Sequence, residues 1–214
     1  MRNSPKPANQ EVDFHDKRKT CKRYNFVGDA HALTFSCFQR RPFLNRDRTR
    51  HWFLESLQDA RRALHFEVWA YVIMPEHIHV LLRPRDAGYE MRRILVALKR
   101  PVSDAARRYL EQSHDDSWLN RLSVEYPSRR VFRFWQPGGG YDHNLFKSKT
   151  VMAVIDYIHL NPVRRGLVKD PLDWIWSSAG FYAGFENVPI RMDQPDLFDV
   201  RSCIRSTRPC ATVY

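Results

Sequence analysis

Two apolar segments separated by a short break constrain the fold more than any other feature of this sequence. Residues 65–75 (HFEVWAYVIMP) and 77–84 (HIHVLLRP) are rich in β-branched and aromatic side chains, which is typical of strands. Pro75 and Glu76 interrupt the pattern between them. A connection so short joins two strands as an antiparallel hairpin. The sequence therefore predicts a β-hairpin near the centre of the fold.

The segments around this hairpin alternate between strand and helix patterns. Residues 31–41 have the β-branched and aromatic content of a strand. Residues 45–63 place apolar side chains at helical spacing, with Asn45 as the expected N-cap. Residues 89–112 repeat apolar side chains with a period of about 3.6. Pro101 lies within this segment and should kink the helix or divide it into two.

The C-terminal half contains fewer regular patterns. Residues 113–130 are interpreted as a polar connector, and residues 131–136 as a short strand-like piece before a Pro-Gly-Gly-Gly turn. Residues 147–160 carry one apolar side and are predicted to form a helix. Because Pro162 disfavours helical backbone in the residue before it, this helix is expected to end or bend near Asn161.

The order of these elements favours an α+β fold of the ferredoxin-like type. In such a fold an antiparallel sheet carries its helices on one face, which leaves the second face available for a ligand. A length of 214 residues indicates one domain with tails. We expect a basic, flexible leader over residues 1–27, the folded domain over residues 28–185, and an irregular C-terminal tail over residues 186–214.

Charge and cysteine usage restrict the class of protein. Lys and Arg number 35 against 24 Asp and Glu, a formal net charge of +11 that favours an anionic partner such as nucleic acid or a membrane surface. Since no run approaches about 18 apolar residues, no transmembrane helix is expected. The N-terminus lacks the apolar region of a secretory signal, which predicts a cytoplasmic protein. The four cysteines, Cys21, Cys37, Cys203 and Cys210, form no CxxC pair and are expected to be reduced.

The motif His77-Ile78-His79 is the first candidate site. On a strand, residues i and i+2 point to the same face, so the two imidazoles project together while Ile78 points to the core. Two convergent imidazoles can bind a divalent metal ion. The alternative is a pair of hydrogen-bonded histidines on a half-exposed strand.

Tyr157 and Asn161 form the second candidate site. At positions i and i+4 of a helix, the two side chains lie on one face, one turn apart. A tyrosine can act as a covalent nucleophile, and an amide oxygen can bind a hard cation. The alternative places Tyr157 in the core and uses Asn161 to cap the end of the helix.

Basic and aromatic side chains alternate through the second half of the chain. Phosphates are bound by Lys and Arg, and unpaired bases stack on aromatic rings, so the pattern indicates a nucleic-acid surface. A solvated basic face with core aromatics is the competing interpretation. The candidate DNA-binding residues are Lys99, Arg100, Arg133, Trp135, Gln136, Tyr141, Arg164 and Arg165.

Three sequence blocks resemble a known family. VIMPEHIHVLLRP, FWQPGGGYD and YIHLNPVRRGLV, in this order, are similar to motifs of the REP-associated tyrosine transposases, which are single-tyrosine HUH (histidine–hydrophobic–histidine) transposases. HALTFSCFQRRPFL near the start and WIWSSAGFY near the end extend the similarity. The resemblance spans about residues 30–185.

This resemblance implies a fold, a substrate and a set of roles. It implies an HUH endonuclease domain in which His77, His79 and Asn161 bind a divalent metal ion, Mg²⁺ or Mn²⁺, and Tyr157 is the nucleophile. The implied activity is metal-dependent cleavage and strand transfer of single-stranded DNA through a 5′-phosphotyrosine intermediate. The implied partner is hairpin-bearing DNA from repetitive extragenic palindromes, bound in the bacterial cytosol or nucleoid by a monomer or a homodimer, with no membrane.

Two alternatives belong to other functional classes. The first is a catalytically inactive, sequence-specific nucleic-acid-binding protein on the same fold. Its weakness is that a pure binding protein needs none of the four candidate catalytic side chains. The second is an unrelated hydrolase that uses the histidine pair as a zinc site, for which Glu76 is the nearest additional ligand in the sequence.

Overall fold

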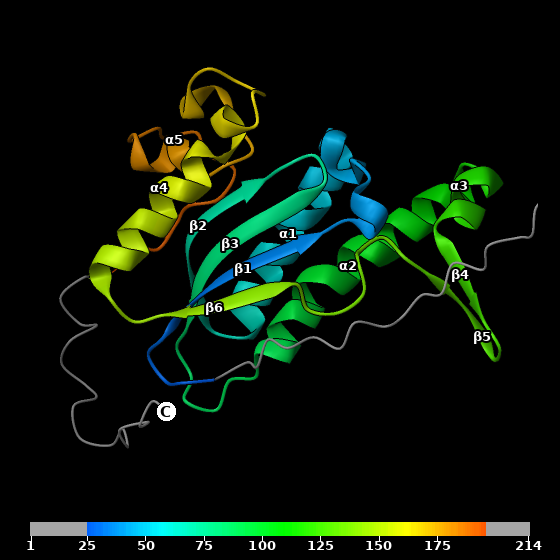
Figure 1. Ribbon diagram of the computed structural model, residues 1–214, viewed down its shortest axis with the longest axis horizontal. Coiled ribbons are helices and arrows are strands. Elements are labelled where there is room, and N and C mark those ends of the chain that lie inside the picture. Colours follow the sequence, from blue (N-terminus) through cyan, green and yellow to red (C-terminus); the bar gives the residue numbers. More distant parts are fainter. Residues whose placement is uncertain (1–24, 196–214) are drawn as a thin grey trace, which may run out of the picture.

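A four-stranded antiparallel sheet forms the centre of the computed structural model, which describes residues 25–195 (Figure 1). The spatial order of the strands is β2-β3-β1-β6, which places β1 and β3 in the middle. This order and the crossover helices confirm the ferredoxin-like α+β fold and the predicted hairpin of β2 and β3. The strands are β1 (Ala30–Ser36), β2 (Phe66–Ile73), β3 (His77–Pro84) and β6 (Tyr141–Leu145).

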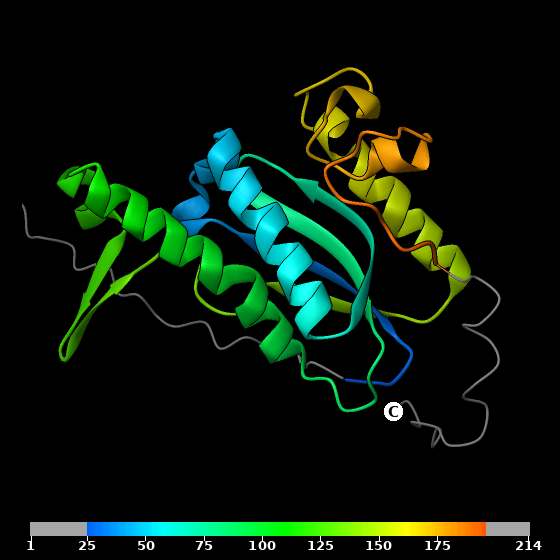
Figure 2. The same ribbon diagram turned by 180° about the vertical axis from the view of Figure 1, so that it is seen from behind.

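Two long helices cover one face of the sheet. Helices α1 (Asp47–Ala63) and α2 (Met91–Gln112) pack against each other and against this face (Figure 2). Alternate residues of each strand enter the core between them, as Ile78, Val80 and Leu82 do on β3. The burial of these side chains is the main source of the fold's stability.

The opposite face of the sheet is covered in part by α4 (Ser148–Arg164). Val151, Ile155 and Ile158 form the apolar side that the sequence predicts, and they pack on β2 and β3 in a second, smaller core. The expectation of helices on one face therefore holds for α1 and α2. Helix α4 occupies the face that was expected to be available, and it brings side chains of its own to that face.

Helix α2 runs through Pro101 without dividing, so of the two expected outcomes, a kink or a division into two helices, the division is wrong. Pro101 has no N–H to donate to the carbonyl oxygen of Ala97, one turn earlier. The buried hydroxyl of Ser56 on α1 donates instead to Ala97 O at 2.9 Å and to Leu98 O at 3.0 Å. Packing against α1 thus supplies the missing hydrogen bond and keeps α2 continuous.

This arrangement predicts an energetic coupling between Ser56 and Pro101. Ser56→Ala should lower the free energy of unfolding by about 1–3 kcal/mol, because it leaves a buried carbonyl without a donor. In a Pro101→Ala background the new amide can donate to Ala97 O, so the same Ser56→Ala change should cost clearly less. Urea unfolding of the four proteins of this double-mutant cycle measures the coupling. Equal costs in both backgrounds would contradict it.

The segment from 113 to 136 differs most from its prediction. Residues 113–130 contain α3 (Asp116–Arg121), β4 (Ser123–Tyr126) and the start of β5 (Arg129–Phe132). The prediction that this segment is a polar connector is therefore wrong. Strands β4 and β5 form a separate hairpin, which projects from the end of α3 (Figure 1). The fourth strand of the main sheet is β6, after the glycine turn, and not residues 131–136.

Two predicted helix ends also require correction. The N-cap of α1 is Arg46, and Asn45 instead ends the short 3-10 helix η2 (Phe43–Asn45). Helix α4 continues through Asn161 and Pro162 to Arg164 rather than ending near Asn161. Both Asn161 and Pro162 are buried, and their packing offsets the local preference against helix before a proline.

The remaining described elements are short. They are two 3-10 helices, η1 (Phe38–Arg40) and η3 (Pro171–Asp173), and the helix α5 (Ala179–Tyr182). Residues 186–195 form no helix or strand, as expected, but Ile190 and Met192 are buried in the main core. In the part of the chain that the structure describes, no helix has the length and apolarity needed to span a membrane.

Several terminal predictions fall outside the described residues. These include Cys21, Cys203, Cys210, most of the leader, and the tail beyond residue 195. Cys37 is a free thiol, and burial raises its pKa to about 12. It is therefore a protonated, apolar core residue at neutral pH.

Gly140, in the turn before β6, makes a close backbone contact with β1. Its φ is +77°, and an added Cβ would lie 2.1 Å from the carbonyl oxygen of Thr34. Only glycine can occupy this position without displacing β1. The Pro-Gly-Gly-Gly turn is thus the means by which β6 is placed beside Thr34, which pairs with Tyr141.

Candidate active site

Side chains from β3 and α4 meet on the face of the sheet that α4 covers. His77 and His79 point to this face because they alternate with Ile78, which lies in the main core. Asn161 Nδ2 lies 3.2 Å from His79 Nε2, and the ring centroid of Tyr157 lies 5.6 Å from that of His79. The structure therefore brings together all four residues that the sequence singles out for chemistry.

The spacing of the two imidazole nitrogens fits a single divalent cation, and the side-chain amide of Asn161 lies beside them. The Nε2 atoms of His77 and His79 are 3.0 Å apart, and the Asn161 amide is 3.2 Å from the second of them. Ligand atoms on adjacent corners of an octahedron with bonds of about 2.1 Å are separated by about 3 Å. Within residues 25–195 no group of three or more His, Cys, Asp or Glu side chains could hold a metal ion. A site here would therefore need the amide oxygen of Asn161 as its third protein ligand.

Two further side chains fix the orientation of the imidazoles. His77 Nδ1 lies 3.2 Å from the carboxylate of Glu76, which also accepts a hydrogen bond from Arg165 at 2.7 Å. His79 Nδ1 lies 2.8 Å from the hydroxyl of Thr34 on β1. These contacts hold the Nδ1 atoms and direct both Nε2 atoms toward each other, as partners of metal-binding histidines do.

Sequence reasoning missed this role for Thr34 and Glu76. Glu76 was considered only as a metal ligand of a zinc hydrolase, whereas its carboxylate is engaged by His77 and Arg165. Its position immediately before the histidine motif was a usable signal. No local signal existed for Thr34, because its contact with His79 depends on the register between β1 and β3.

The histidines are held in the neutral form that binds metal ions. Burial, and to a lesser degree the neighbouring His77, lowers the pKa of His79 to about 3. Burial also lowers the pKa of His77, against an opposing effect of the Glu76 carboxylate. A neutral imidazole has one unprotonated ring nitrogen, and this is the form in which histidine binds a metal ion.

Tyr157 differs from its neighbours because it is open to solvent. Its side chain is 43% exposed, whereas Asn161, one turn later, is 6% exposed. The guanidinium of Arg164 lies 5.1 Å from the centroid of the tyrosine ring. The phenol is therefore accessible from outside, next to a positive charge and beside the imidazole of His79.

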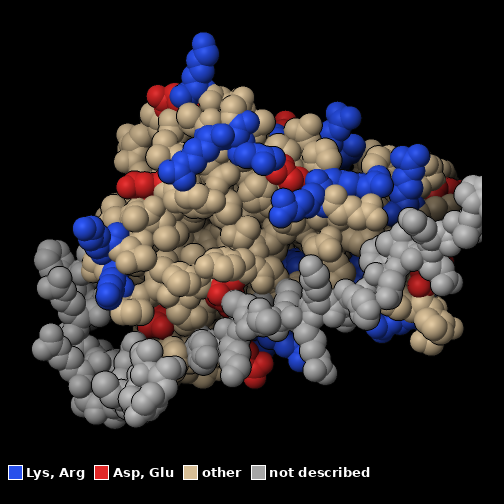
Figure 3. All heavy atoms as spheres, in the orientation of Figure 1, with Lys and Arg blue, Asp and Glu red and all other residues tan. Residues whose placement is uncertain are grey.

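Most of the candidate DNA-binding residues gather in two places. Lys99, Arg100, Arg133 and Gln136 line a cavity of about 540 Å³ between α2 and the segment that follows β5. Arg165 contacts Glu76 beside the histidines. Figure 3 shows Lys and Arg side chains in a band across this face, from the C-terminal end of α4 over the loops at the end of the sheet to α3.

Tyr141 and Trp135 have opposite environments. Tyr141 is 57% exposed, and its ring stacks on that of His143 with a centroid distance of 6.1 Å and an interplanar angle of 11°. Trp135 is only 5% exposed and packs edge-on against Phe35 and Phe134 in the core. Most of its ring is therefore covered by the core, although Trp135 also lines the cavity that contains Lys99 and Gln136.

The fold and the order of the site residues define the class of protein. The chain is a ferredoxin-like domain with an HxH strand and a tyrosine-bearing helix, and its backbone is similar to that of a REP-associated tyrosine transposase solved in complex with a REP hairpin. That likeness has a TM-score of 0.57 at 22% sequence identity and covers 88% of this chain and 99% of the other.

Two curated proteins are related to the chain in sequence. One, assigned to the REP-associated tyrosine transposases of Haemophilus influenzae, is 27% identical over 144 residues, which is 62% of this chain and 74% of that protein. The REP-associated tyrosine transposase of Escherichia coli is 25% identical over 158 residues, 73% of this chain and 80% of its own length. No protein-family model matches the chain. The resemblance inferred from the three motif blocks is confirmed: the chain is a relative of REP-associated tyrosine transposases.

Proposed function

We propose that this protein is a metal-dependent transposase that cuts and rejoins single-stranded, hairpin-bearing DNA through a 5′-phosphotyrosine intermediate. The observation that carries the proposal is the convergence of His77, His79 and Asn161 beside the exposed ring of Tyr157: the two imidazole Nε2 atoms are 3.0 Å apart, and the side-chain amide of Asn161 contacts the second of them. The names of the sequence relatives support the reaction class.

The residues of the site divide into two functional groups. His77, His79 and Asn161 would hold a divalent cation, which supplies neutralising charge to the non-bridging oxygens of a phosphodiester. Imidazole and amide ligands together suit Mn²⁺, and Mg²⁺ if water completes the coordination. Glu76 and Thr34 keep the imidazoles in position. These five residues bind and orient, and none of them enters a covalent bond.

Tyr157 carries the covalent step. Its phenol gives up a proton and the oxygen attacks phosphorus to form a P–O bond. The bond from phosphorus to the 3′ oxygen breaks, and the 3′ oxygen takes up a proton, so one proton is released and one is gained. The protein then holds the 5′-phosphate of the downstream strand. Because a phosphodiester is exchanged for a phosphodiester, the 3′-hydroxyl of another strand can reverse the step without a nucleotide cofactor.

The DNA partner is supported by charge and by the structural relative. A net charge of +11 includes the exposed Arg164 and Arg165 beside the site and the exposed Arg100 on α2, and cations of this kind bind phosphates. The solved relative is a REP-associated tyrosine transposase bound to a REP hairpin. We therefore assign a hairpin with adjoining single strand as the substrate.

A covalent-adduct assay tests this function. The protein is incubated with Mn²⁺ and single-stranded oligonucleotides that contain a REP-type hairpin, and the products are separated under denaturing conditions. We expect a protein–DNA adduct that retains a label only when the label lies 3′ of the cut. Tight binding of the hairpin without any adduct would instead support the inactive binding protein.

The contact between Thr34 and His79 gives a separate prediction for metal binding. Thr34→Val preserves the shape of a half-buried residue but removes the hydroxyl 2.8 Å from His79 Nδ1. Loss of such an orienting contact lowers metal affinity about 10- to 100-fold. Mn²⁺ titration followed by calorimetry measures the effect. Ser36→Ala, two residues along the same strand face, is the matched control, and an equal loss in both variants would contradict the role of Thr34.

A further inference from the structure

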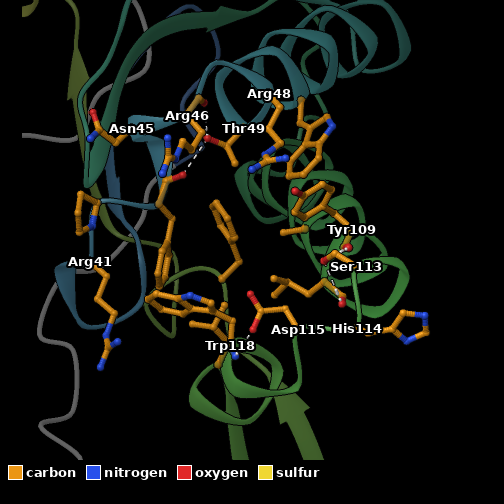
Figure 4. Close-up of a pocket in the computed structure, with 17 residues that line it drawn as sticks. Arg41, Asn45, Arg46, Arg48, Thr49, Tyr109, Ser113, His114, Asp115 and Trp118 are labelled. Atoms are coloured by element: carbon orange, nitrogen blue, oxygen red, sulfur yellow. Dashed lines mark hydrogen bonds between the residues drawn. The ribbon is translucent and has the colours of Figure 1, made fainter.

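A groove of about 920 Å³ lies between α1, α2 and α3, within the usual size range of ligand sites. It is distinct from the histidine site, which lies on the other face of the sheet. Figure 4 shows Trp118 on one side of the groove and Arg48 with Tyr109 on the other. Arginine and aromatic side chains dominate its walls, chiefly Arg41, Arg46, Arg48, Trp52, Tyr109 and Trp118.

The groove carries uncompensated positive charge. Within the described part of the chain, none of Arg41, Arg46 and Arg48 forms an ion pair with a carboxylate. The one acidic residue among the described residues that line the groove is Asp115, and its carboxylate accepts a hydrogen bond from the amide of Trp118 at 3.2 Å. The groove therefore favours an anion.

The aromatic rings provide flat surfaces beside these charges. The guanidinium of Arg48 lies 3.9 Å from the ring centroid of Tyr109, and that of Arg41 lies 5.7 Å from the centroid of Trp118. Tyr109 is 37% exposed. A ligand that suits such walls combines negative charge with a flat ring, and a nucleotide has both in its phosphate and its base.

The segment that carries Arg41, on one side of the groove, is hydrogen-bonded to the loop that precedes the histidine site. Cys37 N donates to Glu76 O at 2.8 Å, and Leu44 N donates to Pro75 O at 2.9 Å, so the segment that carries Arg41 is joined to the loop before His77. The band of Lys and Arg in Figure 3 follows the same edge of the molecule. A DNA strand that leaves the histidine site along this edge reaches the groove.

We propose that the groove binds a few unpaired nucleotides of the DNA strand that flanks the cleaved phosphodiester, with bases on the aromatic walls and phosphates on the arginines. The groove is thereby a second contact with the substrate, remote from the reacting atoms. This inference rests on the proposed function for its ligand, but its test depends on binding and not on cleavage.

The test compares the affinities of the full-length protein for related DNA hairpins by fluorescence anisotropy. The probes are a bare hairpin and the same hairpin with about ten unpaired thymidines on its 5′ or its 3′ side, so that a few of them can enter the groove and the others span the distance from the hairpin. We expect one of the two extensions to raise affinity about tenfold or more. An extension of abasic residues should lose most of that gain, since it retains phosphates without bases.

Paired variants locate the contact. Arg41→Ala/Arg48→Ala should remove most of the gain from the extension while leaving the affinity for the bare hairpin close to that of the parent. Arg93→Ala/Arg108→Ala removes the same charge from exposed positions of α2 outside the groove, and it should keep the gain.

Three outcomes would overturn the inference: no gain from either extension, an equal loss in the two double variants, or thymidine monophosphate competing as strongly as the extended hairpin. The last outcome would indicate a site for free nucleotides. The adduct assay is scored separately, so a gain from the extension without any adduct contradicts the proposed chemistry and supports the groove.

Discussion

Tyr157→Phe should produce a stable protein that binds hairpin DNA about as well as the parent but forms no covalent adduct. The ring that contacts His79 and Arg164 is retained, so packing changes little. The attacking oxygen is absent, and the Thr34 hydroxyl beside the histidines is engaged by His79 Nδ1. Loss of a nucleophile lowers a reaction of this type by more than about a thousandfold. Denaturing electrophoresis with labelled DNA measures adduct and cleavage, and anisotropy measures binding.

Tyr141→Phe is the control for the loss of an exposed tyrosine hydroxyl. Tyr141 is another exposed tyrosine on the same face of the sheet, where it stacks on His143 rather than on His79. Its phenylalanine variant should still form the adduct. If adduct were lost in Tyr141→Phe and kept in Tyr157→Phe, the nucleophile would be Tyr141 and the assignment of α4 would be wrong.

His77→Ala should abolish both Mn²⁺ binding and cleavage. The variant removes one of two imidazoles whose Nε2 atoms are 3.0 Å apart, and it leaves too few protein ligands to hold the ion. We expect Mn²⁺ affinity to fall by about a hundredfold or more, since even the loss of an orienting partner costs 10- to 100-fold. His77 is preferred to His79 for this test because His79 is 8% exposed and its truncation would leave a cavity under α4.

His143→Ala serves as the control for histidine loss. His143 is exposed on β6, on the same face of the sheet, but its ring stacks on Tyr141 and not on His77 or His79. Its replacement should leave Mn²⁺ affinity within about twofold of the parent. Cleavage that persists in His77→Ala after thorough chelation would refute the metal assignment.

The sequence predicted the fold best where local pattern and tertiary packing agree. The hairpin of β2 and β3 needs only a short connection between two apolar strands, and both strands lie where the pattern placed them. The helix predictions at prolines were wrong where a residue distant in the sequence compensates for the hydrogen bond that proline cannot donate. Ser56 supplies the hydrogen bond that Pro101 cannot, and it lies 41 residues from the carbonyl that accepts it.

Strand β6 shows why the fourth strand was missed. Its residues Tyr141–Leu145 (YDHNL) are mostly polar and lack the content of a strand. The strand exists because Gly140 allows a close approach to β1, and because Asp142 is buried against His31 with an Nδ1–Oδ1 distance of 2.8 Å. Such a pairing depends on contacts more than 100 residues apart in the chain, which no local window contains.

The sequence predicted the reactive side chains of the candidate site but not the residues that hold them in position, Thr34 and Glu76. Periodicity on one strand and one helix was enough to select His77, His79, Tyr157 and Asn161. Their mutual distance required the packing of α4 on β2 and β3, which follows from the second core. The burial of Trp135 could not be predicted from the sequence either. An aromatic residue near arginines has the same local sequence pattern whether it faces a base or the core.

The position of α4 in the chain gives the protein an order of assembly during synthesis. The sheet is complete once Leu145 has emerged, and it then already carries both imidazoles. Tyr157 and Asn161, the proposed nucleophile and amide ligand, follow on the next element, so a chain that ends before Ser148 lacks both. On the proposed function, a nascent or truncated chain of this length lacks the group that attacks DNA, and strand cutting requires α4 to have been made.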